Sequence, residues 1–312
     1  ARVIIVAAVL GTSYLGNTYQ SANTIPNVLF ELFAAGVLQS ILVPIMVQAV
    51  DHSSHEEAEE TAAVVLGAVL SMLAAVVAAG LIAGPWIMRI LGSGVDRPAV
   101  EAGEVQLGTF LLWFFLPQIL FSAANLGATA VLNATGYFAL PVFAPTVNNV
   151  VVIGSYLLFA VMRDGEPPSL VLTTPEKLVL ALGTTLGVVA FCVVPVIGAY
   201  RTGFRIRASF RFRHPVLRRL ARQGFWAAGF LAFSQVLLVA MLYLANGSEG
   251  GVVVQQLAYS LFLLPNSLFA VPVFTTAFPA LTRYAHGAQW GDFGDEVARA
   301  TRSISVFTLA ST

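Results

Sequence analysis

Apolar residues dominate long stretches of this chain, and short polar segments separate these stretches. Each stretch is about as long as the 20 helical residues needed to cross a bilayer core of about 30 Å. A helix satisfies its own backbone groups in hydrocarbon, whereas an open sheet does not. The pattern therefore predicts membrane-spanning helices. The clearest stretches are Thr61–Ile82, Leu107–Leu132, Phe138–Met162, Leu178–Tyr200, Phe225–Leu244 and Val252–Phe278.

The whole chain divides into nine predicted membrane segments, which indicates an all-α polytopic membrane protein. The sequence begins at Ala1 rather than Met and stops at Thr312 inside an apolar run, so we expect a fragment whose first and last segments are truncated. The predicted segments are Arg2–Tyr14, Ser21–Val50, Thr61–Leu91, Val105–Leu132, Phe138–Met162, Glu176–Tyr200, Gln223–Leu244, Val252–Tyr284 and Glu296–Thr312.

Charge is scarce and unevenly placed. Charged residues make up 10% of the sequence, against about 25% in soluble domains. Eight of the 16 Lys and Arg residues lie in the short stretch Arg201–Arg222. Short loops rich in Lys and Arg stay in the cytoplasm, so this stretch should be cytoplasmic. Alternation then places Asp51–Glu60, Thr135–Tyr137 and Arg283–Asp295 inside, and Gly92–Glu104, Arg163–Lys177 and Asn246–Gly251 outside.

The basic stretch also suggests a partner. Apolar residues and Arg alternate over Phe204–Arg213, a texture that nucleic-acid-binding segments share. A segment beside a membrane helix is explained more simply by anionic phospholipid headgroups, at about 1 kcal/mol per basic residue. We therefore expect Arg201–Arg222 to contact anionic phospholipids, and we expect no nucleic acid.

No residue pattern typical of a soluble enzyme is present. There is no phosphate-binding loop and no nucleophile elbow, and the single cysteine, Cys192, lies in an apolar stretch. His52 and His55 stand beside glutamates in a polar inner loop, where a solvated helix start is a simpler explanation than a metal site. We therefore expect no enzymatic activity, no metal and no cofactor.

Polar side chains within the predicted membrane segments are the candidates for function, because such groups usually face a cavity or a partner. Glu31 is the one acid predicted deep in a span, and Arg2 on the preceding segment is the expected neighbour. For each Asn or Gln, cavity lining and hydrogen bonding between helices are both open. The amide residues are Asn17, Gln20, Asn23, Asn27, Gln39, Gln118, Asn125, Asn133, Asn148, Asn149, Gln235, Gln255, Gln256 and Asn266.

A faint internal repeat connects the second and eighth segments. The run Ile25–Phe30 recurs as Leu264–Phe269, and a second proline follows each copy, at Pro44 and at Pro279. Repeated halves with broken helices in corresponding positions are typical of transporters, whose site lies where the halves meet. The repeat therefore favours a transporter built from two related halves.

Three stretches resemble the MurJ/MviN lipid II flippases, in order and spacing over nearly the whole chain. The first is Ser21–Gly36, continuing to Val43–Pro44. The second combines Phe115–Phe121 with Leu132–Asn149, and the third runs from Leu264 to Arg283. The pair Asn148–Asn149 and the phenylalanine at Phe30 resemble the actinobacterial branch of this family.

The resemblance implies the two-lobe exporter fold of the multidrug/oligosaccharidyl-lipid/polysaccharide superfamily, with six helices in each lobe around a central cavity. Residues 1–200 would then form the first transmembrane lobe, 201–222 a basic cytoplasmic linker, and 223–312 the start of the second lobe. With only one complete lobe, we expect residues 1–312 alone not to flip lipid.

The resemblance also implies a substrate cavity. Arg2 matches a cavity arginine of the family, and Asn17 falls where many members have Asp. We expect the cavity to be lined by Arg2, Asn17, Asn27, Glu31, Asn148 and Asn149. Three positions depart from the family pattern: Phe30 and Ser260 replace common arginines, and Ala35 replaces a common Glu.

The implied function is flipping of lipid-linked peptidoglycan precursor across the bacterial cytoplasmic membrane by alternating access. The arginines would hold the pyrophosphate, which suits their bidentate geometry. Two alternatives stay open. The first is another exporter of the superfamily that moves a drug or polysaccharide lipid. The second is a non-transporting scaffold that recruits cell-wall synthesis proteins, which the missing arginines suggest.

Overall fold

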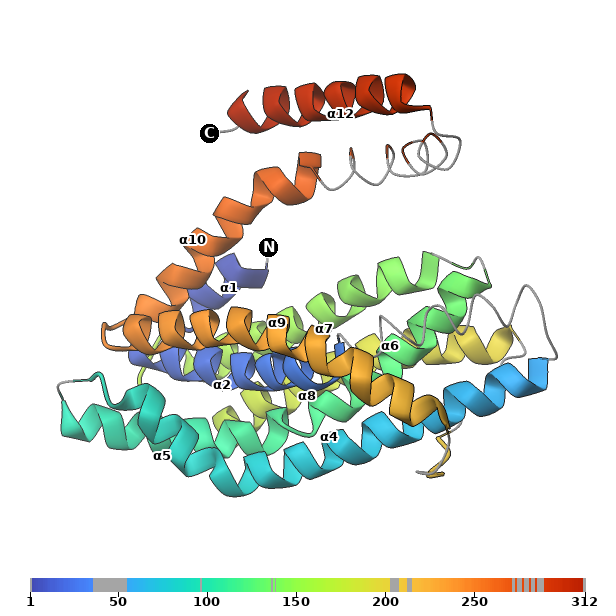
Figure 1. Cartoon of the computed structure of the whole chain (residues 1–312). Helices are drawn as coiled ribbons and strands as arrows, with labels where there is room; N and C mark the ends of the chain where they lie inside the picture. The colour runs from blue at the N-terminus through green and yellow to red at the C-terminus, as the bar shows by residue number, and fades with distance from the viewer. Residues whose placement is uncertain are drawn as a thin grey trace. The chain divides into compact units, whose positions relative to one another are not determined.

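The structure is a computed structural model, and all of its regular elements are helices (Figure 1). It describes residues 2–35, 55–95, 97–135, 137, 139–202, 208–211, 215–270, 273, 277, 281, 284 and 289–310. Among these residues, five helical stretches are long and apolar enough to cross a membrane. They are Ala63–Gly92, Pro98–Asn133, Ala139–Arg163, Thr174–Arg201 and Gly251–Ala270. The predicted all-helical, multi-pass character is therefore confirmed.

The chain divides into two compact units, Ala1–Val253 and Val254–Thr312. The first unit contains α1 (Arg2–Val9), α2 (Tyr14–Phe30), η1 (Glu31–Ala35), α4 (His55–Gly92), α5 (Pro98–Phe115), α6 (Gln118–Ala134), α7 (Ala139–Arg163), α8 (Thr174–Arg201) and α9 (Pro215–Asn246). Helix α10 (Gly251–Pro265) begins there, and the second unit continues with η2 (Asn266–Ala270) and α12 (Trp290–Ala310). Helix α9 packs on α4 and α2 within the first unit, and the predicted lobes 1–200 and 223–312 stay a prediction.

The first predicted segment ends earlier than expected. Helix α1 stops at Val9, and α2 starts at Tyr14 after a turn in which Gly11 has a φ of 69°. The hydroxyl of Ser13 accepts a hydrogen bond from the Gly16 N–H and so caps α2. The sequence predicted a loop between the segments Arg2–Tyr14 and Ser21–Val50. In the structure the residues of this predicted loop open a continuous helix, and Asn17 therefore belongs to α2 rather than to the helix of Arg2.

The predicted fourth segment is two helices with a break between them. Pro117 ends α5 because proline has no N–H for the helical ladder, and α6 resumes at Gln118. The start of α5 also differs from the prediction. Pro98 occupies the first helical turn, so the predicted outer loop Gly92–Glu104 becomes helical over its second half.

The two copies of the sequence repeat both adjoin π-helical turns. Element η1 begins at Glu31, directly after the copy Ile25–Phe30, and η2 begins at Asn266 inside the copy Leu264–Phe269. Each copy carries a proline, Pro26 or Pro265, within its helix. Short π-helical turns often mark functional positions in helices. The two turns begin at different positions relative to the copies, so the repeat itself stays a prediction.

The turns predicted to lie outside the membrane meet at one end of the first unit. Gly11 lies against Pro168, Gly250 against Thr12, and Gly94 against Gly247. We call this the outer end; it comprises the α1–α2 turn, the α4–α5 turn, the α7–α8 loop 164–173 and the α9–α10 turn 247–250. At the opposite end, the Ser209 N–H bonds to the Ala63 carbonyl and Arg211 pairs with Glu60. The turns and residues named here thus lie at the ends that the predicted topology gives them, whereas the side of the membrane stays a prediction.

Candidate functional site

A buried polar network joins α2 to the α9–α10 turn at the outer end. Asn17 is fully buried, and its amide Nδ2 donates to the Ser248 carbonyl at 2.8 Å. The Asn17 Oδ1 accepts a hydrogen bond from the Val252 N–H at 3.0 Å. One side chain therefore supplies both a donor and an acceptor to backbone that lies more than 200 positions away.

Glu104 is the second centre of this network. Its side chain is 1% exposed. Its Oε1 lies 3.3 Å from the Thr18 hydroxyl of α2, and its Oε2 accepts from the Asn246 amide of α9 at 3.1 Å. The same Asn246 nitrogen donates to the Leu91 carbonyl at the end of α4. No basic side chain in the described part of the chain pairs with Glu104. The carboxyl group thus joins α2, α5 and α9 through neutral partners.

The burial of Glu104 could have been predicted from helical spacing, but not from the length of the apolar stretches. Once Pro98 is taken as the helix start, Glu104 lies on the same face as Leu107, Leu111 and Phe115, all of which are buried. The hydropathy pattern instead predicted an outer loop at Glu104 and pointed to Glu31 as the acid deep in a span. In the structure Glu104 is the buried acid and Glu31 is exposed at the start of η1, so the predicted depth of Glu31 in a span stays a prediction.

A second polar cluster surrounds Arg2. The guanidinium of Arg2 lies against the phenol groups of Tyr156 of α7 and Tyr19 of α2. The two tyrosine hydroxyls lie 2.8 Å apart, and Tyr19 also bonds to the Thr184 hydroxyl of α8. Because the Thr184 proton points to the Leu180 carbonyl, Tyr19 donates to Thr184 and Tyr156 donates to Tyr19. Arg2 is therefore anchored by aromatic hydroxyls, and no ion pair joins it to Glu31 among the described residues.

The other predicted cavity residues are not brought into one cluster. Asn27 and Glu31 are exposed, and together with Asn23 they form a polar stripe at four-residue spacing along α2 and η1. Asn149 is exposed on α7. Asn148 packs against Gly187 of α8, and its Oδ1 is buried without a hydrogen-bond partner. The fully buried Asn17 holds backbone in place, so its predicted contact with a substrate stays a prediction.

A buried ion pair fixes the long outer loop. Arg163, at the end of α7, lies 3.5 Å from Glu176 in the first turn of α8, and both side chains are 8% exposed. Glu176 also accepts from the N–H and hydroxyl of Thr173, which completes a capping box for α8. The turn between them uses a positive φ at Asp164 and Gly165. Neither member of this pair was predicted from the sequence, where both fall at the edges of an outer loop.

Comparison with known proteins accounts for this arrangement of helices. A family model described as the lipid II flippase MurJ matches residues 6–312. The chain belongs to the MurJ family. A MurJ structure described as the inward closed conformation superposes with a TM-score of 0.72 at 20% sequence identity, covering 98% of this chain and 59% of that one. The predicted family is thereby confirmed, and this chain has the helical fold of the corresponding part of a MurJ structure.

Curated MurJ relatives match over most of this chain. A probable lipid II flippase MurJ of Rhizobium tropici is 27% identical over 284 residues, which are 91% of this chain and 51% of that protein. The lipid II flippase MurJ of Burkholderia cenocepacia is 25% identical over 288 residues, covering 91% and 53%. The probable MurJ of Haemophilus influenzae is 24% identical over 299 residues. The chain spans about half the length of these relatives.

Some residues that the sequence singled out lie outside the described residues. The alternating Phe204–Arg213 segment is described only over 208–211, and His52 and the side chain of Ala35 lie outside the description. Phe30 is partly buried at the end of α2, and Ser260 bonds to the Gln256 carbonyl of its own helix. At Phe30 and Ser260, where many family members have arginine, this chain therefore has an apolar and a locally bonded side chain.

Proposed function

We propose that the protein to which this sequence belongs flips a lipid-linked peptidoglycan precursor, lipid II, across the bacterial cytoplasmic membrane by alternating access. The observation that carries the proposal is the MurJ family match over residues 6–312. In this proposal 1–200 is the first lobe, 201–222 a cytoplasmic linker and 223–312 the start of the second lobe. The actinobacterial character suggested by Phe30 and Asn148–Asn149 belongs to the same proposal.

The polar stripe along α2 and η1, of which Asn27 and Glu31 are exposed, supports a water-filled cavity. Asn23, Asn27 and Glu31 lie on one side of the helix, and Glu31 carries an ionisable carboxyl group. A charged side chain facing lipid at mid-helix costs about 2.5–3.5 kcal/mol on insertion scales, so this face should meet water or a polar headgroup. We place the lipid headgroup along this stripe, with Asn149 as a further polar contact.

Arg2 is the proposed pyrophosphate ligand. The tyrosines that hold its guanidinium are neutral, so the full positive charge stays available to an anion. Tyr19 and Tyr156 would keep the planar group in a fixed orientation, which bidentate binding of a phosphate needs. The outer-end network around Asn17 and Glu104 would hold the outer side closed while the headgroup enters from the cytoplasm.

The test replaces Arg2 in the complete gene product and measures rescue of a bacterial strain depleted of its own flippase. Arg2→Ala removes a charge-assisted contact worth about 1.5–3 kcal/mol, so we expect flipping to fall about tenfold or more. Arg2→Lys should restore little, because an ammonium lacks the guanidinium fork. Arg97→Ala removes an exposed charge elsewhere and should rescue normally. Normal rescue by Arg2→Ala would refute the assignment.

The same experiment separates the alternatives. If every cavity variant rescues like the wild type while deletion of the gene does not, the protein acts as a scaffold for cell-wall synthesis proteins. If purified protein moves a drug or another polysaccharide lipid in vesicles but not lipid II, it is a different exporter of the superfamily. Anionic phospholipid at Arg201–Arg222 remains a proposed partner, supported by the exposed Arg211.

A further inference from the structure

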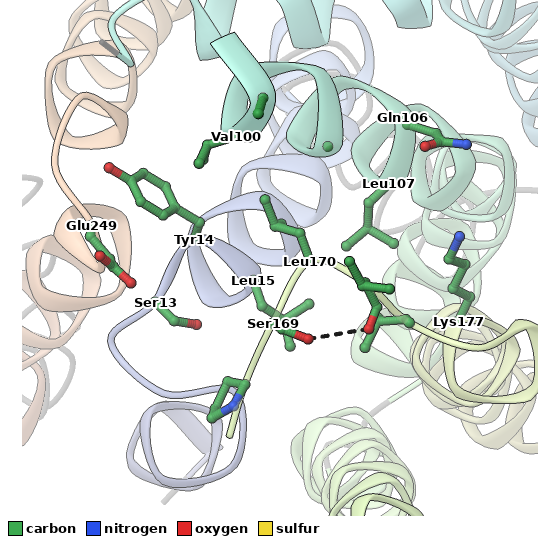
Figure 2. A pocket seen from close by; sticks show the side chains of 15 residues that line it. Ser13, Tyr14, Leu15, Val100, Gln106, Leu107, Ser169, Leu170, Lys177 and Glu249 are labelled. Carbon is green, nitrogen blue, oxygen red and sulfur yellow. Dashed lines mark hydrogen bonds between the residues drawn. The ribbon is translucent and has the colours of Figure 1, made fainter. Parts of the chain in front are cut away.

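A pocket of about 460 Å³ opens at the outer end, away from Arg2 and the polar stripe on α2 (Figure 2). Its walls come from the start of α2, one face of α5, the α7–α8 loop, the first turn of α8 and the α9–α10 turn. Lys177 and Gln106 lie on one side of the pocket and Glu249, Ser13 and Tyr14 on the other. The volume falls in the range of about 300–1,000 Å³ that small-ligand sites occupy.

One wall of the pocket is a non-helical segment with unpaired backbone N–H groups. Residues 168–172 are neither helical nor paired in a sheet. No backbone hydrogen bond is found for the N–H groups of Ser169, Leu170, Val171 and Leu172 within the described part of the chain. The Ser169 hydroxyl donates to the Val171 carbonyl, which steadies the turn of this segment. Unpaired N–H groups of such a non-helical segment can pair with another extended chain.

Two unpaired charges stand at opposite sides of this wall. Lys177 is the only lysine in the sequence, and it is partly buried at the pocket. Glu249 is exposed in the α9–α10 turn. Neither forms an ion pair with any residue that the structure describes. Between them, Leu15, Leu107 and Leu170 provide apolar contacts (Figure 2).

We propose that this pocket binds a short extended peptide, whose terminal carboxylate contacts Lys177 and whose backbone pairs with residues 168–172. The partly exposed Leu170 accepts a side chain of the peptide, and Glu249 accepts a cationic group at its other end. A free short peptide and the C-terminal tail of a protein share this chemistry. The proposal does not depend on lipid flipping, because it concerns a separate pocket and is tested by binding alone.

The experiment uses the purified complete gene product in detergent and the tripeptide Ala-Leu-Ala. Binding is measured as protection of Lys177 from an amine-reactive reagent. The extent of modification is read by mass spectrometry of the proteolytic fragment of the protein that contains Lys177. We expect concentration-dependent protection by the tripeptide. The same tripeptide with its C-terminus amidated should bind at least about tenfold more weakly, because it loses a charge-assisted hydrogen bond. Equal protection by the amide would overturn the proposal.

Matched variants separate the pocket from the surface. Ala99→Trp fills the pocket from its rim and should abolish binding, whereas Ala102→Trp places the same ring on an exposed α5 position outside it and should not. Lys177→Gln should weaken binding of the free acid, followed by calorimetry, and Arg97→Gln should leave it unchanged. Undiminished binding by Lys177→Gln or Ala99→Trp would show that the peptide binds elsewhere.

N-acetylation of the tripeptide distinguishes the two sources. If the acetylated peptide binds as well as the free one, the chemistry suits the C-terminal tail of a protein. If acetylation weakens binding and Glu249→Gln removes that effect, the pocket takes a free peptide through both of its ends.

Discussion

At the residue scale, Asn17 shows how much one amide can hold together. Its two polar atoms are bonded to backbone groups of the α9–α10 turn, at 2.8 Å and 3.0 Å, and no water-exposed surface remains on it. Within a low-dielectric interior, a backbone group that loses such a partner bears its full desolvation cost. The side chain therefore stabilises two segments at once.

We expect Asn17→Ala to lower the free energy of unfolding by about 1–3 kcal/mol, because it leaves the Val252 N–H buried without a partner and removes one of the two hydrogen bonds to the Ser248 carbonyl. The measurement is thermal or denaturant unfolding of the purified protein in detergent. The matched control is Asn27→Ala in the same helix, since Asn27 is exposed and bonds only to the Asn23 carbonyl one turn away. Equal stability of the two variants would contradict the structural role of Asn17.

The sequence identified polar residues in the membrane segments but not the role of each. Arg2 was singled out as a cavity residue beside Glu31, which stays a prediction, and the residues nearest its guanidinium are tyrosines, which apolar periodicity places in the core without saying what they bond. Glu104 was missed because its helix begins seven residues earlier than predicted, at Pro98. Partners that are distant in sequence, such as Asn246, are set by tertiary packing that no local pattern contains.

At the scale of elements, glycine spacing explains the close packing of α7 on α8. Gly183 and Gly187 stand four residues apart on α8 and let the helices approach closely. A Cβ atom at Gly183 would lie 2.1 Å from the Ser155 Cβ, and one at Gly187 would lie 2.4 Å from the Val152 Cγ2. These distances leave no room for a side chain without movement of a helix.

We expect Gly183→Ala to destabilise the protein by about 1–3 kcal/mol through overpacking. Gly154→Ala, on α7, is the control, because no atom lies within 4 Å of the added Cβ. Alanine there should be neutral or stabilising by about 0.5–1 kcal/mol, as in other helices. Unfolding midpoints of the two purified variants give the comparison. A stable Gly183→Ala protein would show that α7 and α8 are less closely packed than described.

The sequence predicted which helices exist better than it predicted where they begin and end. The apolar stretches corresponding to α4, α6, α7 and α8 were all predicted, because about 20 apolar residues in succession have few alternatives in a bilayer. The turn at Leu10–Ser13 was misplaced because polar Asn17 and Gln20 resembled a loop, although they are buried in α2. Hydropathy does not distinguish a polar side chain facing water from one bonded to another helix.

At the scale of the whole molecule, the clustering of loops gives a direct test of orientation. Ser169 lies at the outer end, and Ala208 is exposed near the contact of Ser209 with Ala63 at the other end. In a background without Cys192, cysteines introduced at Ser169 and Ala208 should react with an impermeant reagent from opposite sides of the membrane. The basic stretch predicts that Ala208 reacts only from the cytoplasm. Reaction of both from outside would contradict the predicted topology.

The division into units was the part least accessible to sequence. The family resemblance implied a boundary at the basic stretch Arg201–Arg222, which stays a prediction, and in the structure α9 packs with helices that precede that stretch. Side-chain contacts of α9, such as the bond from Asn246 to Glu104, decide this division. A linker rich in arginine marks a loop that stays on one side of the membrane, but it does not show which helices pack together on either side of it.

The long separation between Asn17 and Ser248 has a consequence during synthesis. The two partners are 231 positions apart, so at about 5–20 residues per second Asn17 enters the membrane roughly 12 to 46 s before its partner exists. Throughout that interval the nascent α2 carries an unsatisfied amide, which lipid does not solvate. Helix α2 must therefore wait beside a temporary polar neighbour, whether the insertion machinery or another nascent helix. Slowing translation downstream of α2 should prolong that association.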